Sequence, residues 1–175
     1  MKKVIAMCCL IAVLCCVFTG CQKTTDATEY DSLYLEYPDV QTPLFDICDA
    51  IWRRVLSKQP VLQGMPVTVN QITGANKEQL MGDITVQMEH AILLEADSLL
   101  YGGCFFIIEL SRETNYEKEL KKVVDRMPIT HWMSEPGYTR DEIIVKNVDN
   151  LAIISLNNLF PEEYINAFNH VVDGE

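Results

Sequence analysis

Apolar residues recur at three-and-four spacing in three parts of the chain, the pattern of helices that bury one face. The first helix is predicted to begin at Thr42-Pro43 and to end before Gln59-Pro60. Thr42 can cap it, and Pro43 suits its first position because proline lacks the N–H that would have no partner there. Its apolar face would consist of Leu44, Ile47, Cys48, Ile51, Trp52, Val55 and Leu56.

Two further helices are predicted in the C-terminal half. Thr114 and Glu117 have the spacing of a capping box, which predicts a helix from there to Met127. Glu117 and Lys121 are four residues apart and would form an ion pair on its outer side. The last helix is expected to begin near Pro161, with two acidic residues in its first turn, where the helix dipole favours negative charge.

Runs of apolar and β-branched residues predict strands between these helices. Residues 86–95 and 104–110 are two such runs, and 104–108 is apolar without interruption, which is typical of a central strand or one covered on both faces. Residues 143–145 and 151–154 flank a turn and predict a hairpin. The region between 61 and 82 is less regular, with a candidate strand at 67–69 and a short helical patch at 77–81.

The order strand, strand, helix therefore occurs twice after the first helix, in 86–127 and in 142–172. Hairpins pair antiparallel, and each helix has one apolar face to bury. The simplest architecture is an α+β domain over residues 43–175, with an antiparallel sheet of about four strands and the helices packed on one face. The other face of the sheet would then meet solvent or a partner.

The N-terminus has the pattern of an export signal. Lys2 and Lys3 precede an uncharged run, 4–18, that is shorter than the about 20 residues needed to span a membrane. The run ends at Phe18-Thr19-Gly20-Cys21, which resembles the lipobox of bacterial lipoprotein precursors. That resemblance implies removal of residues 1–20, a diacylglyceryl group on the Cys21 thiol, fatty acyl chains such as palmitate, and a location at the extracytoplasmic face of the cell membrane.

Residues 21–42 are predicted to be a polar tether between that lipid and the domain. Loss of residues 1–20 removes two lysines and no acids, so the formal charge changes from −11 to −13. This charge argues against nucleic acid as a partner, because phosphates would be repelled. The expected partners are the membrane, through the lipid, and an envelope protein.

Cysteine usage fits export. Once the signal is removed and Cys21 is lipidated, only Cys48 and Cys104 remain, so at most one disulfide could form. Cys48 lies on the apolar face of the first helix and Cys104 begins an apolar strand, so two buried thiols are favoured over a disulfide. The cysteines inside the signal are Cys8, Cys9, Cys15 and Cys16.

No catalytic, cofactor or metal-binding motif is found in the sequence. The histidines, His90, His131 and His170, are too far apart to form a metal-site pattern. The loop 129–141 is the candidate binding segment because it combines a histidine with aromatic residues, and loops on rigid scaffolds often bind ligands. The alternative is that its large side chains fold back onto the core. The candidate residues are His131, Trp132, Met133 and Tyr138.

The order of elements also resembles a family of small Gram-positive lipoproteins known only as a domain of unknown function. The resemblance is carried by 105–109, 117–127, 142–156 and 161–172, and it implies no activity and no catalytic residues. We therefore expect a non-enzymatic binding or accessory module at the cell envelope, with no cofactor, acting through the open sheet face or the 129–141 loop. The alternative is a small envelope enzyme that uses Cys48/Cys104 thiol chemistry or a site centred on His131.

Overall fold

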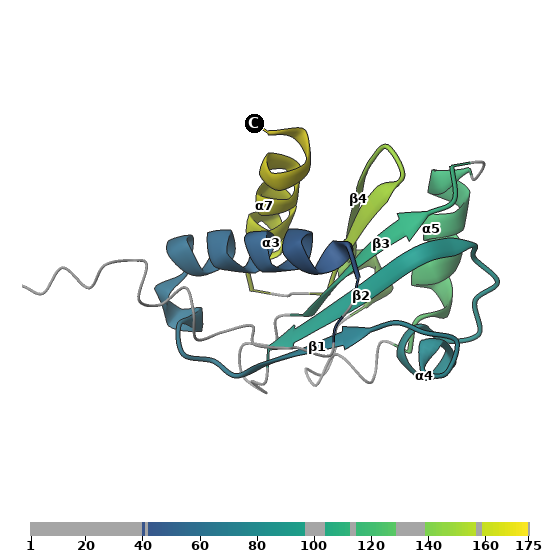
Figure 1. Ribbon diagram of the computed structural model, residues 1–175, viewed down its shortest axis with the longest axis horizontal. Coiled ribbons are helices and arrows are strands. Elements are labelled where there is room, and N and C mark those ends of the chain that lie inside the picture. Colours follow the sequence, from purple (N-terminus) through teal and green to yellow (C-terminus); the bar gives the residue numbers. More distant parts are fainter. Residues whose placement is uncertain are drawn as a thin grey trace, which may run out of the picture. The chain divides into compact units, whose positions relative to one another are not determined.

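Five strands form one antiparallel sheet in the order β1-β2-β3-β5-β4 (Figure 1). The computed structural model describes residues 40, 42–96, 104–112, 115–128, 139–156 and 159–174. The predicted signal and nearly all of the predicted tether lie outside the described residues. The strands are β1 (Val67–Gln71), β2 (Met88–Ala96), β3 (Cys104–Leu110), β4 (Ile144–Val148) and β5 (Leu151–Ser155).

Within the described residues, four α-helices and two 3-10 turns are connected to this sheet. The α+β class and the two strand-strand-helix units are confirmed, while the sheet has five strands rather than about four because 67–71 pairs with β2. The helices are α3 (Leu44–Lys58), α4 (Lys77–Met81), α5 (Tyr116–Arg126) and α7 (Pro161–Asp173), and the turns are η1 (Pro60–Leu62) and η2 (Arg140–Glu142).

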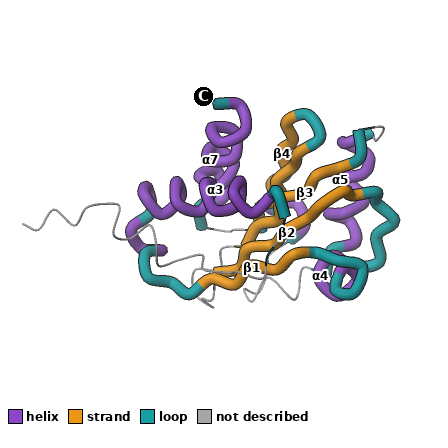
Figure 2. The backbone as a smooth tube through the Cα atoms, in the orientation of Figure 1, coloured by secondary structure: helices purple, strands orange, loops and turns teal. Residues whose placement is uncertain are grey.

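Helices cover both faces of the sheet, so the expectation that they pack on one face is wrong (Figure 2). Successive residues of β3 point to opposite faces. Phe105 and Ile107 belong to a core shared with α3 and α7, which we call the α3/α7 core. Phe106 and Ile108 belong to a second core shared with α4 and α5, which we call the α5 core. The uninterrupted apolar run of β3 requires this, because each face of the strand has to be shielded from water.

Aromatic side chains fill the centre of the α3/α7 core. Trp52 of α3 and Tyr164 of α7 are stacked with ring centroids 6.5 Å apart, and Phe105 lies 5.3 Å from Tyr164. All three side chains are fully buried. The two helices therefore pack on each other as well as on the sheet, and no open sheet face remains over these central strands for a partner.

The helix ends differ in detail from the predicted caps. Thr42 Oγ1 accepts a 3.4 Å hydrogen bond from the Leu44 N–H, and α3 begins at Leu44. Helix α5 is capped by Asn115, whose Oδ1 accepts a 3.1 Å hydrogen bond from the Lys118 N–H, so the prediction of a Thr114 capping box is wrong by one residue. An asparagine amide oxygen serves the same role as the threonine hydroxyl. Lys121 pairs with Asp125 rather than with the expected Glu117.

Candidate functional site

The end of the β1–β2 ladder leaves part of β2 uncovered on one side. The last main-chain hydrogen bond between the two segments joins the Ile72 N–H to the Ala91 carbonyl at 2.9 Å. The chain then turns away, because the Thr73 N–H donates to Asn76 Oδ1 at 2.7 Å and the Thr73 carbonyl accepts from Lys77 at the start of α4. The first residues of β2 therefore have β3 on one side and, within the described residues, no strand on the other.

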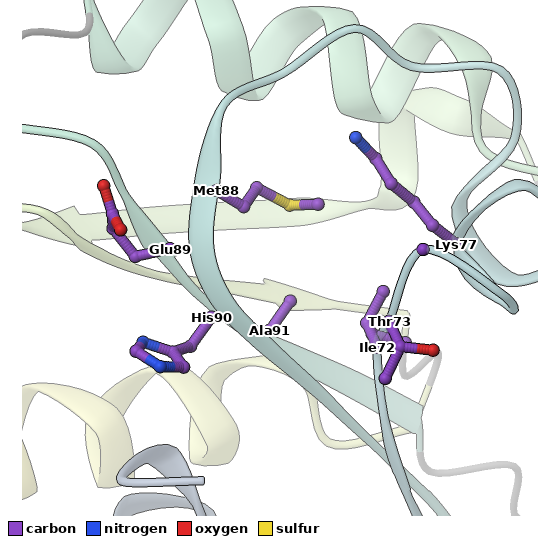
Figure 3. A pocket seen from close by; sticks show the side chains of 8 residues that line it. Ile72, Thr73, Lys77, Met88, Glu89, His90 and Ala91 are labelled. Carbon is purple, nitrogen blue, oxygen red and sulfur yellow. The ribbon is translucent and has the colours of Figure 1, made fainter.

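A β-bulge lies in the same stretch of β2. Met88 pairs with Leu110 and His90 pairs with Glu109, so Glu89 is an extra residue that β3 does not match. Met88 packs against the α5 core and Ala91 belongs to it, although they are three residues apart. Figure 3 shows the consequence: Met88 and His90 project to opposite sides of β2. Bulges of this kind commonly occur next to functional sites, where they redirect a side chain.

A polar cluster on the opposite side of the strand holds the bulged segment. His90 Nδ1 lies 2.8 Å from Glu109 Oε2, and the Asn150 side chain donates to Glu109 Oε1 at 3.1 Å. A carboxylate only accepts hydrogen bonds, so Nδ1 of His90 carries the hydrogen and Nε2 carries the lone pair in the neutral ring. The cluster joins β2, β3 and the β4–β5 turn. Its side chains are partly exposed, at 42% for His90 and 27% for Glu109.

An open cleft of about 260 Å³ lies beside the uncovered part of β2 (Figure 3). One side chain, Lys77, reaches across from α4 and donates a 3.2 Å hydrogen bond to the Val86 carbonyl, which fixes its ammonium group at the cleft. A methyl group added at Gly74 would meet no atom within 4 Å, so this wall is open. The lining residues are Ile72, Thr73, Gly74, Lys77, Met88, Glu89, His90 and Ala91.

The two thiols of the domain are buried in different cores. Cys48 belongs to the α3/α7 core and Cys104 to the α5 core, on opposite faces of the sheet, and both are free. Burial, with a smaller contribution from the nearby charge of Asp49, raises the pKa of the Cys48 thiol. Burial, with a smaller contribution from Glu95, raises the pKa of Cys104 well above its ordinary value. Thiolate is the reactive form of cysteine, so this environment opposes thiol chemistry.

The candidate loop residues His131, Trp132, Met133 and Tyr138, and the lipidation residue Cys21, lie outside the described residues. The structure does show how the chain is held just after that loop. The Arg140 guanidinium donates to the carbonyls of Val124 and Met127, the latter at 2.8 Å, and so satisfies the C-terminal end of α5. The segment after the loop is therefore attached to the helix that precedes it.

Among the described residues, no group of three or more His, Cys, Asp or Glu side chains could hold a metal ion. No helix in the described ranges combines the length and apolar character that a membrane crossing requires. No protein-family model matches the sequence, and no curated protein or solved structure matches it. The resemblances to the lipobox and to the lipoprotein family of unknown function stay predictions.

The residues of the cleft and of the polar cluster were not singled out as a site by the sequence. His90 and Glu109 are 19 residues apart, and their contact depends on the register of β2 and β3. The available signal was that Glu109 is the one charged residue within the otherwise apolar run 104–110. A hairpin drawn with the correct register would have placed them opposite one another.

Proposed function

We propose that this protein is an extracytoplasmic lipoprotein, held at the cell membrane by acyl chains on Cys21, that acts as a binding module of the cell envelope. The lipobox pattern at residues 18–21 supports the anchor, since a diacylglyceryl group provides the two chains that stable attachment requires. The observation that carries the binding role is the cleft beside the bulged start of β2, where main-chain groups and a fixed ammonium face an open space.

The alternative of a thiol enzyme is disfavoured by a specific observation. Cys48 and Cys104 lie on opposite faces of the sheet, and burial raises the pKa of each thiol. Neither can readily form a thiolate, and the two cannot act together. The binding role needs no such chemistry.

Site-specific photo-crosslinking of the full chain in living cells tests the binding role. A photoreactive residue at Glu89, which is exposed and lines the cleft, is compared with one at Glu117, which is exposed on α5. The proposal predicts a light-dependent adduct, detected by mass spectrometry of the protein, at position 89 and not at 117. Equal labelling at both positions, or none at 89, would contradict it.

A further inference from the structure

The main chain of Met88 faces the cleft. In an antiparallel ladder, opposed residues alternate between pairs that exchange hydrogen bonds with each other and pairs that do not. The Ser111 N–H donates to the Gln87 carbonyl, whereas the Leu110 N–H donates in the other direction, to Asn150. Met88 and Leu110 are therefore a pair that does not exchange hydrogen bonds. It follows that the N–H and C=O of Met88 point away from β3, toward the side where β1 has ended.

If β1 continued past Ile72 in the same direction, its main chain would lie beside Met88. Within the described residues, no strand lies there. A segment running on beyond Ile72 in the direction of β1 would pass His90 and Glu89 first, then Met88, and would end beside Val86. It could exchange two main-chain hydrogen bonds with Met88, as an added strand does at a sheet edge. Those two groups would select an extended backbone of the peptide type rather than a particular side chain.

The charges at the two ends of the cleft match the two ends of a short peptide. The Lys77 ammonium is held at the Val86 carbonyl, at the end where an antiparallel ligand would place its C-terminal carboxylate. Glu89 lines the cleft on the other side of Met88, and Figure 3 shows Met88 between Lys77 and Glu89. An ammonium favours a carboxylate and a carboxylate favours an ammonium, so a zwitterion would meet a complementary charge at each end.

The size of the cleft limits the ligand. Its volume of about 260 Å³ is just below the range of 300–1,000 Å³ typical of pockets for drug-sized molecules. We infer that the cleft binds a short peptide with free ends, of about two residues, whose backbone pairs with Met88 and whose carboxylate meets Lys77. This inference rests on the proposed binding role and specifies the class of ligand.

Titration of the full ¹⁵N-labelled chain in detergent with the dipeptide Ala-Ala, followed by NMR, tests it. A ligand of this size is expected to bind with a dissociation constant of roughly 1 mM. The Met88 amide proton should move downfield as it gains a hydrogen bond, and the amides of Thr73 and Gly74 should shift with it. Ala-Ala with an amidated C-terminus should bind about ten-fold more weakly, because the contact with the ammonium is lost.

Variants locate the effect. Lys77→Met should weaken Ala-Ala binding about ten-fold or more and remove the difference between the free acid and the amide. Lys77→Arg keeps a cation, so it should retain both the binding of Ala-Ala and the difference between the free acid and the amide. Glu89→Gln should weaken the binding of Ala-Ala. It should leave the binding of N-acetyl-Ala-Ala, which lacks the ammonium, unaffected. Lys118→Met and Glu117→Gln make the same chemical changes on the exposed side of α5 and should bind as the unaltered chain does.

Two results would overturn the inference: no shift at Met88 at about twenty times the expected dissociation constant, or equal binding of Ala-Ala and its amide. Its failure is distinguishable from failure of the binding role. If Glu89 still gives a specific adduct in cells while Ala-Ala does not bind, the cleft is a binding site for another class of ligand. If neither is observed, both proposals are wrong.

Discussion

Replacement of Gly82 by alanine tests how α4 is held against the end of α5. Gly82 ends α4 with φ +81° and ψ −176°, a backbone conformation that is open almost only to glycine. A Cβ there would overlap the main-chain carbonyl oxygen of Arg126, and it would lie 3.2 Å from the carbonyl carbon. Two separate penalties therefore add: backbone strain in α4, and displacement of the last turn of α5.

The magnitude follows from these two penalties. Strain in this region costs about 1–3 kcal/mol for a residue with a side chain, and forcing apart packed segments costs about 1–3 kcal/mol more. We expect Gly82→Ala to lower the free energy of unfolding by about 3 kcal/mol. With a urea m-value of about 2 kcal/mol per molar, the midpoint of denaturation should fall by about 1.5 M.

Two other glycines separate the penalties. Gly64 has φ +80° but open space around the added Cβ, so Gly64→Ala should cost only about 1 kcal/mol. Gly74 has no positive φ and also faces open space, so Gly74→Ala should change stability by less than about 0.5 kcal/mol. Urea denaturation followed by circular dichroism measures all three. Equal losses for Gly82→Ala and Gly64→Ala would refute the close approach of α4 to Arg126.

Three further predictions concern polar groups and thiols. Arg140→Ala removes the donors to the Val124 and Met127 carbonyls and should lower the free energy of unfolding, measured by urea denaturation, by about 1–3 kcal/mol, while Arg140→Lys recovers only part of the loss. Ser155→Ala should leave stability unchanged or raise it by up to about 1 kcal/mol, because the buried Ser155 hydroxyl has no hydrogen-bond partner among the described residues; a clear loss in urea denaturation would contradict this. Cys48 and Cys104 should react with a thiol reagent only on unfolding. Burial raises the pKa of both thiols in the folded state, so the thiols of the unfolded chain ionise first. The free energy of unfolding should therefore fall above about pH 9, by up to about 1.4 kcal/mol per pH unit for each thiol. Cys48→Ala should reduce that slope.

The sequence contained most of the information needed for the elements but not for their placement. The three-and-four spacing in α3, α5 and α7 shows that each helix buries one face, but it cannot show which side of the sheet it packs against. The uninterrupted apolar run in β3 was the signal for two covered faces. A strand that is apolar at every position argues against an open sheet face.

The cleft was even less predictable from the sequence than the placement of the helices. It arises where β1 ends at Gln71 while β2 continues to Met88, and where Glu89 bulges. Both features depend on the register of strands that are distant in sequence, and register is set by the whole sheet. The hydrogen bond of His90 with Glu109, which holds the bulge, is visible only once that register is known.

The anchor on Cys21 is the central claim, and metabolic labelling tests it most directly. Cells that produce the full chain are grown with an alkyne-bearing palmitate, and the purified protein is examined for label and for its N-terminal residue. We expect label on a chain that begins at Cys21, its loss in Cys21→Ser, and its retention in Cys104→Ser, which alters a buried thiol. An unlabelled chain, or label that persists in Cys21→Ser, would contradict it.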